Sequence, residues 1–362
     1  MTRPLGVVLV GYGYAGRVFH APLILHTPGL RLRAVVSSDP ARVHADLPQA
    51  EVLSDPERAF ALPGTDLVVV AAPNAVHAAL AVAAVRAGRH VLVDKPFATT
   101  LDEARQVAAA ATAAGRIASV FQNRRWDADF LALRGLVGCG ALGEVSELHS
   151  HFDRFRPQVP DRWRERPGAG AGLWFDLGPH LVDQVLQLFG LPLSVQADIA
   201  IQREGAQVDD FFHVVLRYRR LRAILHAGVL VPAGTLRFAV HGSRGSWLKH
   251  GLDPQEAALR AGIAPGAPDW GRDPRPGTLV VADADGGAEE SSVACPPGDY
   301  RACYAAMRDA ILGRGQPPVG LAEALQVMGV LEAASESAAS GRAIALDPGR
   351  FSAPPAPAGG CG

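Results

Sequence analysis

Cysteine is scarce in this chain. Cys139, Cys295, Cys303 and Cys361 show neither a C-x-x-C pair nor the regular spacing of a disulfide framework. This spacing argues against structural zinc and is typical of proteins in the reducing cytoplasm. We therefore expect a cytoplasmic protein without a metal centre.

An excess of charge and a long apolar run are also missing. Thirty-five Lys and Arg stand against 36 Asp and Glu, a formal net charge of −1, which offers no general attraction for nucleic acid. The apolar run Leu5–Val10 is too short for a transmembrane helix or a signal-peptide core. We expect small-molecule partners, with no binding to nucleic acid or membrane.

The length of 362 residues suffices for two domains, each with its own core. In the first third, strand-like apolar runs alternate with alanine-rich helical stretches at Ala75–Ala87 and Leu101–Ala114. This is the pattern of a doubly wound parallel sheet covered by helices on both faces. Its strands are predicted at Leu5–Val10, Leu30–Val36, Leu67–Ala71, Val91–Val93 and Ile117–Val120.

After about Gln122 the pattern changes. A helix is predicted at Asp127–Val137, strands then follow one another without helices between them, and helices return at Tyr300–Leu312 and Leu321–Ser340. Such a succession of strands favours a large, mostly antiparallel sheet. The strands are predicted at Val145–Phe152, Ser194–Ile201, Phe211–Tyr218, Ala223–Leu230, Leu236–Val240, Ser246–Lys249 and Leu279–Ala282.

A glycine-rich loop follows the first predicted strand. Gly11, Gly13 and Gly16 form G-x-G-x-x-G between a strand and a helix. They would make the tight turn, admit a pyrophosphate and let the helix pack on the strand, while the helix N-terminus offers free amides. The motif predicts a Rossmann dinucleotide-binding domain over residues 1–122. Its predicted cofactor-binding loop is Gly11, Tyr12, Gly13, Tyr14, Ala15 and Gly16.

The end of the second predicted strand bears on the choice of dinucleotide. An acid about 20 residues past the glycines would bind both ribose hydroxyls and repel a 2′-phosphate. That place falls on Ser37, with Ser38 as a second donor and Arg42 in the next turn, which favours NADP. Alternatively, a shift of two residues makes Asp39 the ribose ligand and gives NAD, or Asp39 simply begins the next helix.

Two further strand ends should lie beside the cofactor, because ligands bind at the carboxyl edge of such sheets. Pro73 and Asn74 follow the third core strand; Asn74 either contacts the nicotinamide half or caps the next helix. Lys95, within Asp94-Lys95-Pro96, follows the next strand. A lysine pKa falls readily on burial, so Lys95 can handle protons. Pro73, Asn74, His77 and Lys95 complete the predicted cofactor site.

A second constellation lies in the C-terminal part. Asp176, His180 and Asp183 are spaced i, i+4, i+7, which places them on one stripe of a helix. Because Pro179 is tolerated in a first turn, the helix is predicted to start near Asp176. Asp176 could simply be a helix cap and His180 a buried partner. Together with a dinucleotide and Lys95, they predict a proton-handling site.

These motifs together resemble the Gfo/Idh/MocA oxidoreductases. The resemblance rests on the glycine loop, on Asp94-Lys95-Pro96 (usually Glu-Lys-Pro in the family) and on the Gly172–His180 segment. Asn123–Asp127 and Ser150–Pro157 are similar to the branch with the NADP-dependent scyllo-inositol dehydrogenases. The resemblance implies an α/β protein with the Rossmann domain and a C-terminal α+β domain over residues 123–346 that has an open sheet. The end of the chain is rich in Pro, Gly and Ala, which predicts a disordered tail over 347–362.

The resemblance also implies the chemistry. Lys95, Asp176 and His180 would meet between the domains as catalytic residues of an NADP-dependent oxidoreductase acting on a secondary alcohol of a cyclitol or sugar. Either Lys95 or His180 could take the hydroxyl proton. Other sugars, such as an aldose or a 3-keto sugar, and a non-catalytic dinucleotide sensor remain alternatives. Family members pair through the open sheet, which implies a homodimer or homotetramer.

A polyol needs many hydrogen-bonding partners, so polar residues near the expected cleft are candidates. His149 and His151 share one face of a strand, but with no third ligand evident, a hydrogen-bonding or core role is favoured over metal. The predicted substrate-binding residues are Lys95, Asn123, Arg125, Trp126, Asp153, Arg154 and His180, with Arg156 and Trp163 as further candidates.

Overall fold

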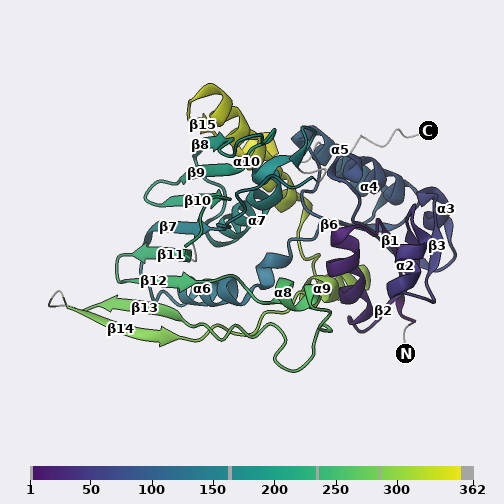
Figure 1. Cartoon of the computed structure of the whole chain (residues 1–362), viewed down its shortest axis with the longest axis horizontal. Helices are drawn as coiled ribbons and strands as arrows, with labels where there is room; N and C mark the ends of the chain where they lie inside the picture. The colour runs from purple at the N-terminus through teal and green to yellow at the C-terminus, as the bar shows by residue number, and fades with distance from the viewer. Residues whose placement is uncertain (1–2, 162–164, 234–235, 284, 286, 352–362) are drawn as a thin grey trace.

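Two sheets organise the computed structural model, which describes residues 3–161, 165–233, 236–283, 285 and 287–351. A six-stranded sheet lies in the N-terminal part and a nine-stranded sheet in the C-terminal part. Figure 1 shows the two sheets at opposite ends of the molecule, with helices packed between and around them. This arrangement confirms the predicted α/β fold class.

The N-terminal sheet is entirely parallel, with the strand order β3-β2-β1-β4-β5-β6 of a Rossmann fold. Its strand β3 was not predicted, since three residues carry too little pattern. The strands are β1 (Leu5–Val10), β2 (Leu30–Val36), β3 (Glu51–Leu53), β4 (Thr65–Val70), β5 (His90–Val93) and β6 (Ala118–Val120).

Both faces of this sheet are buried, which explains the continuous apolar runs. On β1, Val8 and Val10 belong to the core on one face, and Val7 and Leu9 belong to the core on the other. The connecting helices are α1 (Ala21–Leu25), α2 (Pro40–Asp46), α3 (Pro56–Ala61), α4 (His77–Arg86) and α5 (Leu101–Ala114), with a π-helical turn at Gly16–His20.

The C-terminal sheet has the order β14-β13-β12-β11-β7-β10-β9-β8-β15. Its described pairs are antiparallel except for β7 with β10, which confirms the mostly antiparallel sheet. The strands are β7 (Val145–His151), β8 (Ser194–Ala200), β9 (Phe211–Arg217), β10 (Arg222–Gly228), β11 (Leu236–Gly242), β12 (Gly245–His250), β13 (Gly277–Ala282), β14 (Ala288–Val293) and β15 (Ile344–Ala345).

Helices α7 and α10 pack on one face of this sheet, and its other face is free of helices from the described residues. Helix α9 returns to the first domain: Tyr300, Cys303, Tyr304 and Met307 are fully buried in the core that lies on one face of the N-terminal sheet. These helices are α6 (Ala128–Gly138), α7 (Gly172–Phe189), α8 (Gln255–Arg260), α9 (Arg301–Ile311) and α10 (Leu321–Ser340).

Two sequence predictions are corrected. Helix α7 begins at Gly172, a turn earlier than predicted, and carries Pro179 in its interior. Asp209 makes this start possible, because its backbone and side-chain oxygens accept hydrogen bonds from the first amides of the helix. The predicted tail contains a helical turn at Pro348–Phe351, and Phe351 is buried in the core. Residues 352–362 lie outside the described part.

No helix among the described residues combines the length and apolar character required to cross a bilayer.

Candidate active site

A cavity of about 1140 Å³ runs between the two domains. It starts at the glycine loop after β1 and ends at helix α7. Its volume is larger than the roughly 300–1,000 Å³ typical of a pocket for one small ligand. The part toward α7 is lined by Phe121, Asn123, Arg124, Arg154, Arg156, Gln158, Asp176, His180, Glu256 and Arg260, and the part toward the glycine loop by Gly11–Ala15, Ser37–Asp39, Arg42 and Ala71–Asn74.

The glycine loop has room for a phosphate group. A Cβ at Gly11 (φ +97°) would lie 2.5 Å from the Ala71 carbonyl oxygen, and one at Gly16 would lie 2.1 Å from that of Gly11. A Cβ at Gly13, by contrast, would meet no heavy atom within 4 Å. Gly11 and Gly16 therefore permit close backbone packing, while Gly13 keeps the cavity side of the loop open. The loop thus fits the pyrophosphate of a dinucleotide.

The end of β2 faces the same cavity. Val10 pairs with Val36, so Ser37 is the first residue beyond the strand. Ser37 Oγ accepts a hydrogen bond from the Asp39 amide (3.1 Å), and Asp39 Oδ1 accepts one from the Arg42 amide (3.0 Å). Asp39 is thus the N-cap of α2, as one of the predicted alternatives held. Ser37, Ser38 and Arg42 line the cavity beside it.

The loop after β4 contacts both domains. Asn74 Nδ2 donates to the Gly170 carbonyl (2.8 Å), so Asn74 joins this loop to the segment before α7, and its side chain caps no helix. His77, predicted to bind cofactor, does not line the cavity. Its two ring nitrogens instead lie 2.8 and 2.9 Å from the carbonyl oxygens of Pro96 and Ala72, which ties the loops after β4 and β5 together.

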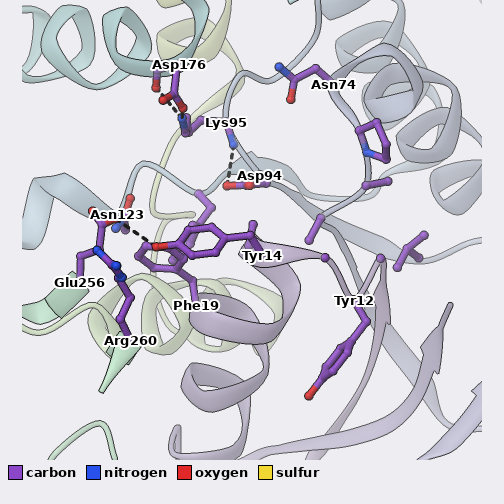
Figure 2. A pocket seen from close by; sticks show the side chains of 18 of the residues that line it. Tyr12, Tyr14, Phe19, Asn74, Asp94, Lys95, Asn123, Asp176, Glu256 and Arg260 are labelled. Carbon is purple, nitrogen blue, oxygen red and sulfur yellow. Dashed lines mark hydrogen bonds and ion pairs between the residues drawn. The ribbon is translucent and has the colours of Figure 1, made fainter. Parts of the chain in front are cut away.

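Lys95 meets Asp176 where the two domains face each other. Lys95 Nζ donates to Asp176 Oδ1 at 2.9 Å and to the Asp176 carbonyl oxygen at 2.5 Å. Figure 2 shows the two side chains pointing toward each other above Asp94. The pair is only partly exposed, with side-chain fractions of 11% and 20%.

His180 lies one turn further along α7 and lines the same cavity. It is buried, with 5% exposure, and its Nδ1 has no hydrogen-bond partner among the described residues. Burial, followed by the positive charges of Lys95 and Arg124, holds the pKa of His180 well below its usual value. At neutral pH the imidazole is therefore uncharged and can accept a proton.

A buried relay behind Lys95 was not predicted. His20 Nδ1 lies 2.6 Å from the Tyr304 hydroxyl, and His20 Nε2 lies 3.6 Å from Asp94 Oδ1. Asp94 Oδ1 accepts a hydrogen bond from the Lys95 amide (2.9 Å). Burial raises the pKa of Asp94, but His20, Lys95 and His77 outweigh burial and hold it at about 2. The ionised Asp94 therefore fixes the Lys95 backbone, with α9 supplying the outermost partner.

Arg124 is a second residue that the sequence did not single out. Its guanidinium contacts Glu256 (2.8 Å) and Asp127 (3.3 Å) and lies over the Phe152 ring. Glu256 also lies 3.3 Å from the Tyr14 hydroxyl, so this contact joins α8 to the glycine loop (Figure 2). The sequence held a signal in its Asn-Arg-Arg-Trp segment, but the prediction chose Arg125.

The structure places three predicted substrate residues elsewhere. Arg125 is buried in an ion pair with Asp183 (2.6 Å), because neighbouring residues of a tight turn point in different directions. Trp126 does not line the cavity, and Asp153 turns toward the open face of the large sheet. These positions correct the predictions for Arg125, Trp126 and Asp153. Asn123, Arg154 and Arg156 do line the cavity, and Trp163 lies outside the described residues.

Comparison with known proteins matches both halves of the chain. A family model described as "Oxidoreductase family, NAD-binding Rossmann fold" covers residues 5–122, and one described as "Oxidoreductase family, C-terminal alpha/beta domain" covers residues 134–346. The chain is 51% identical to the oxidoreductase YdgJ of Escherichia coli (strain K12), over 93% of this chain and 97% of that protein.

Two further relatives support the match. The chain is 37% identical to the scyllo-inositol 2-dehydrogenase (NADP(+)) IolW of Bacillus subtilis (strain 168), over 94% of this chain and 96% of the relative. An oxidoreductase structure from Yersinia pestis superposes with a TM-score of 0.92 at 46% identity, covering 96% of this chain and 98% of that one. The protein is thus an oxidoreductase with an NAD(P)-binding Rossmann fold, and it belongs to the Gfo/Idh/MocA family.

Proposed function

We propose that this enzyme is an NADP-dependent dehydrogenase that transfers a hydride between nicotinamide and a secondary alcohol or ketone carbon of a cyclitol or sugar. The observation that carries the proposal is the Lys95–Asp176 pair beside an uncharged His180, at the end of a cavity that begins at the glycine loop. The name of the Bacillus relative, an NADP-dependent scyllo-inositol dehydrogenase, supports the same substrate class.

The residues have separable roles in this reaction. A bound nicotinamide supplies the hydride acceptor for alcohol oxidation, which leaves the hydroxyl proton for the protein. His180 is unprotonated at neutral pH because its pKa is low, so we assign it to accept that proton. Lys95, held by two oxygens of Asp176, would donate a hydrogen bond to the reacting oxygen and stabilise negative charge there.

The walls of the cavity suit a substrate with several hydroxyl groups. Asn123, Arg124 and Arg154 provide donors, and Glu256 provides acceptors. The Arg154 guanidinium stacks on the Phe152 ring, with Cζ 5.0 Å from the ring centroid. Burial lowers the pKa of Arg154. Because a guanidinium has several donors in a fixed plane, it can bind two neighbouring hydroxyls at once.

The preference for NADP rests on the residues after β2. Ser37 and Ser38 offer hydroxyl donors, and Arg42 offers a positive charge, where an acid would otherwise exclude a 2′-phosphate. The carboxylate of Asp39 already accepts the Arg42 amide as a helix cap, which leaves it less suited to hold ribose hydroxyls. We also propose, from the family resemblance, a cytoplasmic homodimer or homotetramer.

A screen of substrates tests the proposal. Purified full-length enzyme is given NADP⁺ or NAD⁺ with a panel of inositols, aldoses and deoxysugars, and reduced nicotinamide is followed by absorbance. We expect turnover with at least one cyclitol or sugar, faster with NADP⁺ than with NAD⁺. Cofactor binding without turnover across the whole panel would contradict the proposal and favour a dinucleotide sensor, although the retained Lys95, Asp176 and His180 argue against one.

A further inference from the structure

Histidines form a row on the open face of the large sheet, away from the cavity. In the strand register, His151 on β7 lies beside His226 on β10, which pairs with His213 on β9. Alternation places these rings on the face opposite to the buried Leu148 and Phe212, which pack in the core under the helices. The His149-x-His151 motif lies on this face as well, and the proposed dehydrogenase mechanism assigns no role to it.

A carboxylate completes a cluster of three ligand types within this row. Asp153 Oδ2 lies 3.2 Å from His151 Nδ1, and Asp153 Oδ1 lies 3.4 Å from His226 Nε2. One donor atom from each of the three residues falls within 4.8 Å of the others. The Gly228 amide donates to Asp153 Oδ1 at 3.0 Å, which orients the carboxylate from behind, as outer-shell partners do in metal sites.

The charge of Asp153 points to a cation. Its side chain is 6% exposed, yet among the described residues no Lys or Arg forms an ion pair with it, and the titratable groups that contact it there are His151 and His226. Buried carboxylates are otherwise paired with positive groups or coordinate metals. The outer ring nitrogens, His151 Nε2 and His226 Nδ1, have no hydrogen-bond partner in the described part of the chain, so no competing contact holds either ring away from the carboxylate.

We propose that His151, Asp153 and His226 bind one divalent transition-metal ion, with Zn²⁺ as the best match, separately from the catalytic cavity. Two imidazole nitrogens and one carboxylate oxygen are a typical zinc ligand set, which leaves a fourth coordination position for one more ligand. Mg²⁺ and Ca²⁺ prefer oxygen ligands throughout and fit this set poorly. The ion would link β7 to β10, the parallel pair near the centre of the sheet.

Titration of the metal alone tests this site. Full-length, tag-free protein is stripped with a chelator and titrated with ZnCl₂ by calorimetry. We expect one Zn²⁺ per chain, and a rise in melting temperature with Zn²⁺ since the ion binds the folded state. Asp153→Asn and His226→Gln should each weaken binding by more than the roughly 10–100-fold typical of an outer-shell change.

A matched control lies in the same row. His213 pairs with His226 in the register, and the two ring centroids lie 5.6 Å apart, but His213 offers no ligand atom to the cluster. His213→Gln should therefore keep the wild-type affinity. Binding of NADPH to each variant checks that it is folded, and His151→Gln replaces any variant that fails this check. No Zn²⁺ binding by the wild type, or equal loss in His213→Gln and the triad variants, would overturn the proposal. Neither result bears on dehydrogenase activity, which the substrate screen measures.

Discussion

Replacement of Lys95 by alanine tests the centre of the proposed mechanism. In the structure Lys95 Nζ donates to two oxygens of Asp176, and its side chain is 11% exposed at the end of the cavity. Removing a group that stabilises or transfers charge in the transition state typically lowers the rate by about 10²–10⁴-fold, or about 2.7–5.4 kcal/mol of barrier. We expect Lys95→Ala to lose turnover by this factor.

The glycine loop is untouched by this change, so cofactor affinity should remain. Tryptophan or nicotinamide fluorescence during an NADPH titration measures it, and steady-state rates with the best substrate of the screen measure turnover. Lys95→Arg is the matched control. The guanidinium of the introduced arginine can keep the ion pair with Asp176, but it has a different shape and stays protonated at any working pH. If Lys95 only held the domains together, Arg would rescue activity. Turnover within about twofold of wild type in Lys95→Ala would refute the reasoning.

Three further predictions concern protons and cofactor choice. The low pKa of His180 should place the acidic limb of the pH–rate profile for oxidation well below pH 6.5, and a limb near 6.5 would contradict the assignment. His180→Gln should lower turnover by about 10²-fold or more. Arg42→Ala should weaken the binding of NADP⁺ and spare that of NAD⁺, as steady-state KM values would show. Asp39→Ala should lower the free energy of unfolding by about 0.5–2 kcal/mol in urea, because it removes the cap of α2. Burial and Asp129 raise the pKa of Asp253 to about 6, above its unfolded value, so the stability that this group contributes falls as the pH rises from about 4 to 6. Between pH 4 and pH 8, the free energy of unfolding of Asp253→Asn should therefore rise by roughly 3 kcal/mol relative to that of the wild type. A difference that does not change with pH would exclude this carboxyl as the cause.

Much of the N-terminal half could be predicted because its signals are local. The apolar runs of a sheet buried on both faces mark the strands, and the positions of Gly11, Gly13 and Gly16 follow from backbone geometry that only glycine tolerates. Lys95 and Asp176 come together because one ends a strand of the first sheet and the other lies in the first turns of α7. Their contact was implied by the family resemblance and could not be worked out from spacing.

The errors arise where distant residues decide the outcome. The start of α7 depends on Asp209, which lies more than thirty residues after the start of that helix in the sequence. Asp209 caps the helix in place of a local side chain. Arg124 and Arg125 are chemically identical, so only the three-dimensional positions of Glu256 and Asp183 distinguish the cavity residue from the buried one. The Asp153 prediction failed for a similar reason, because its partner His226 lies on another strand.

The return of α9 to the first domain has a consequence for how the enzyme becomes active during synthesis. Tyr300, Tyr304 and Met307 fill the core on one face of the cofactor-binding sheet, and Tyr304 also reaches the His20–Asp94 relay. A nascent chain that ends before α9 lacks these side chains, so part of this core stays exposed to water. We therefore expect the surroundings of Lys95 to be complete only after α9 has been synthesised, because Tyr304 is part of the relay behind it.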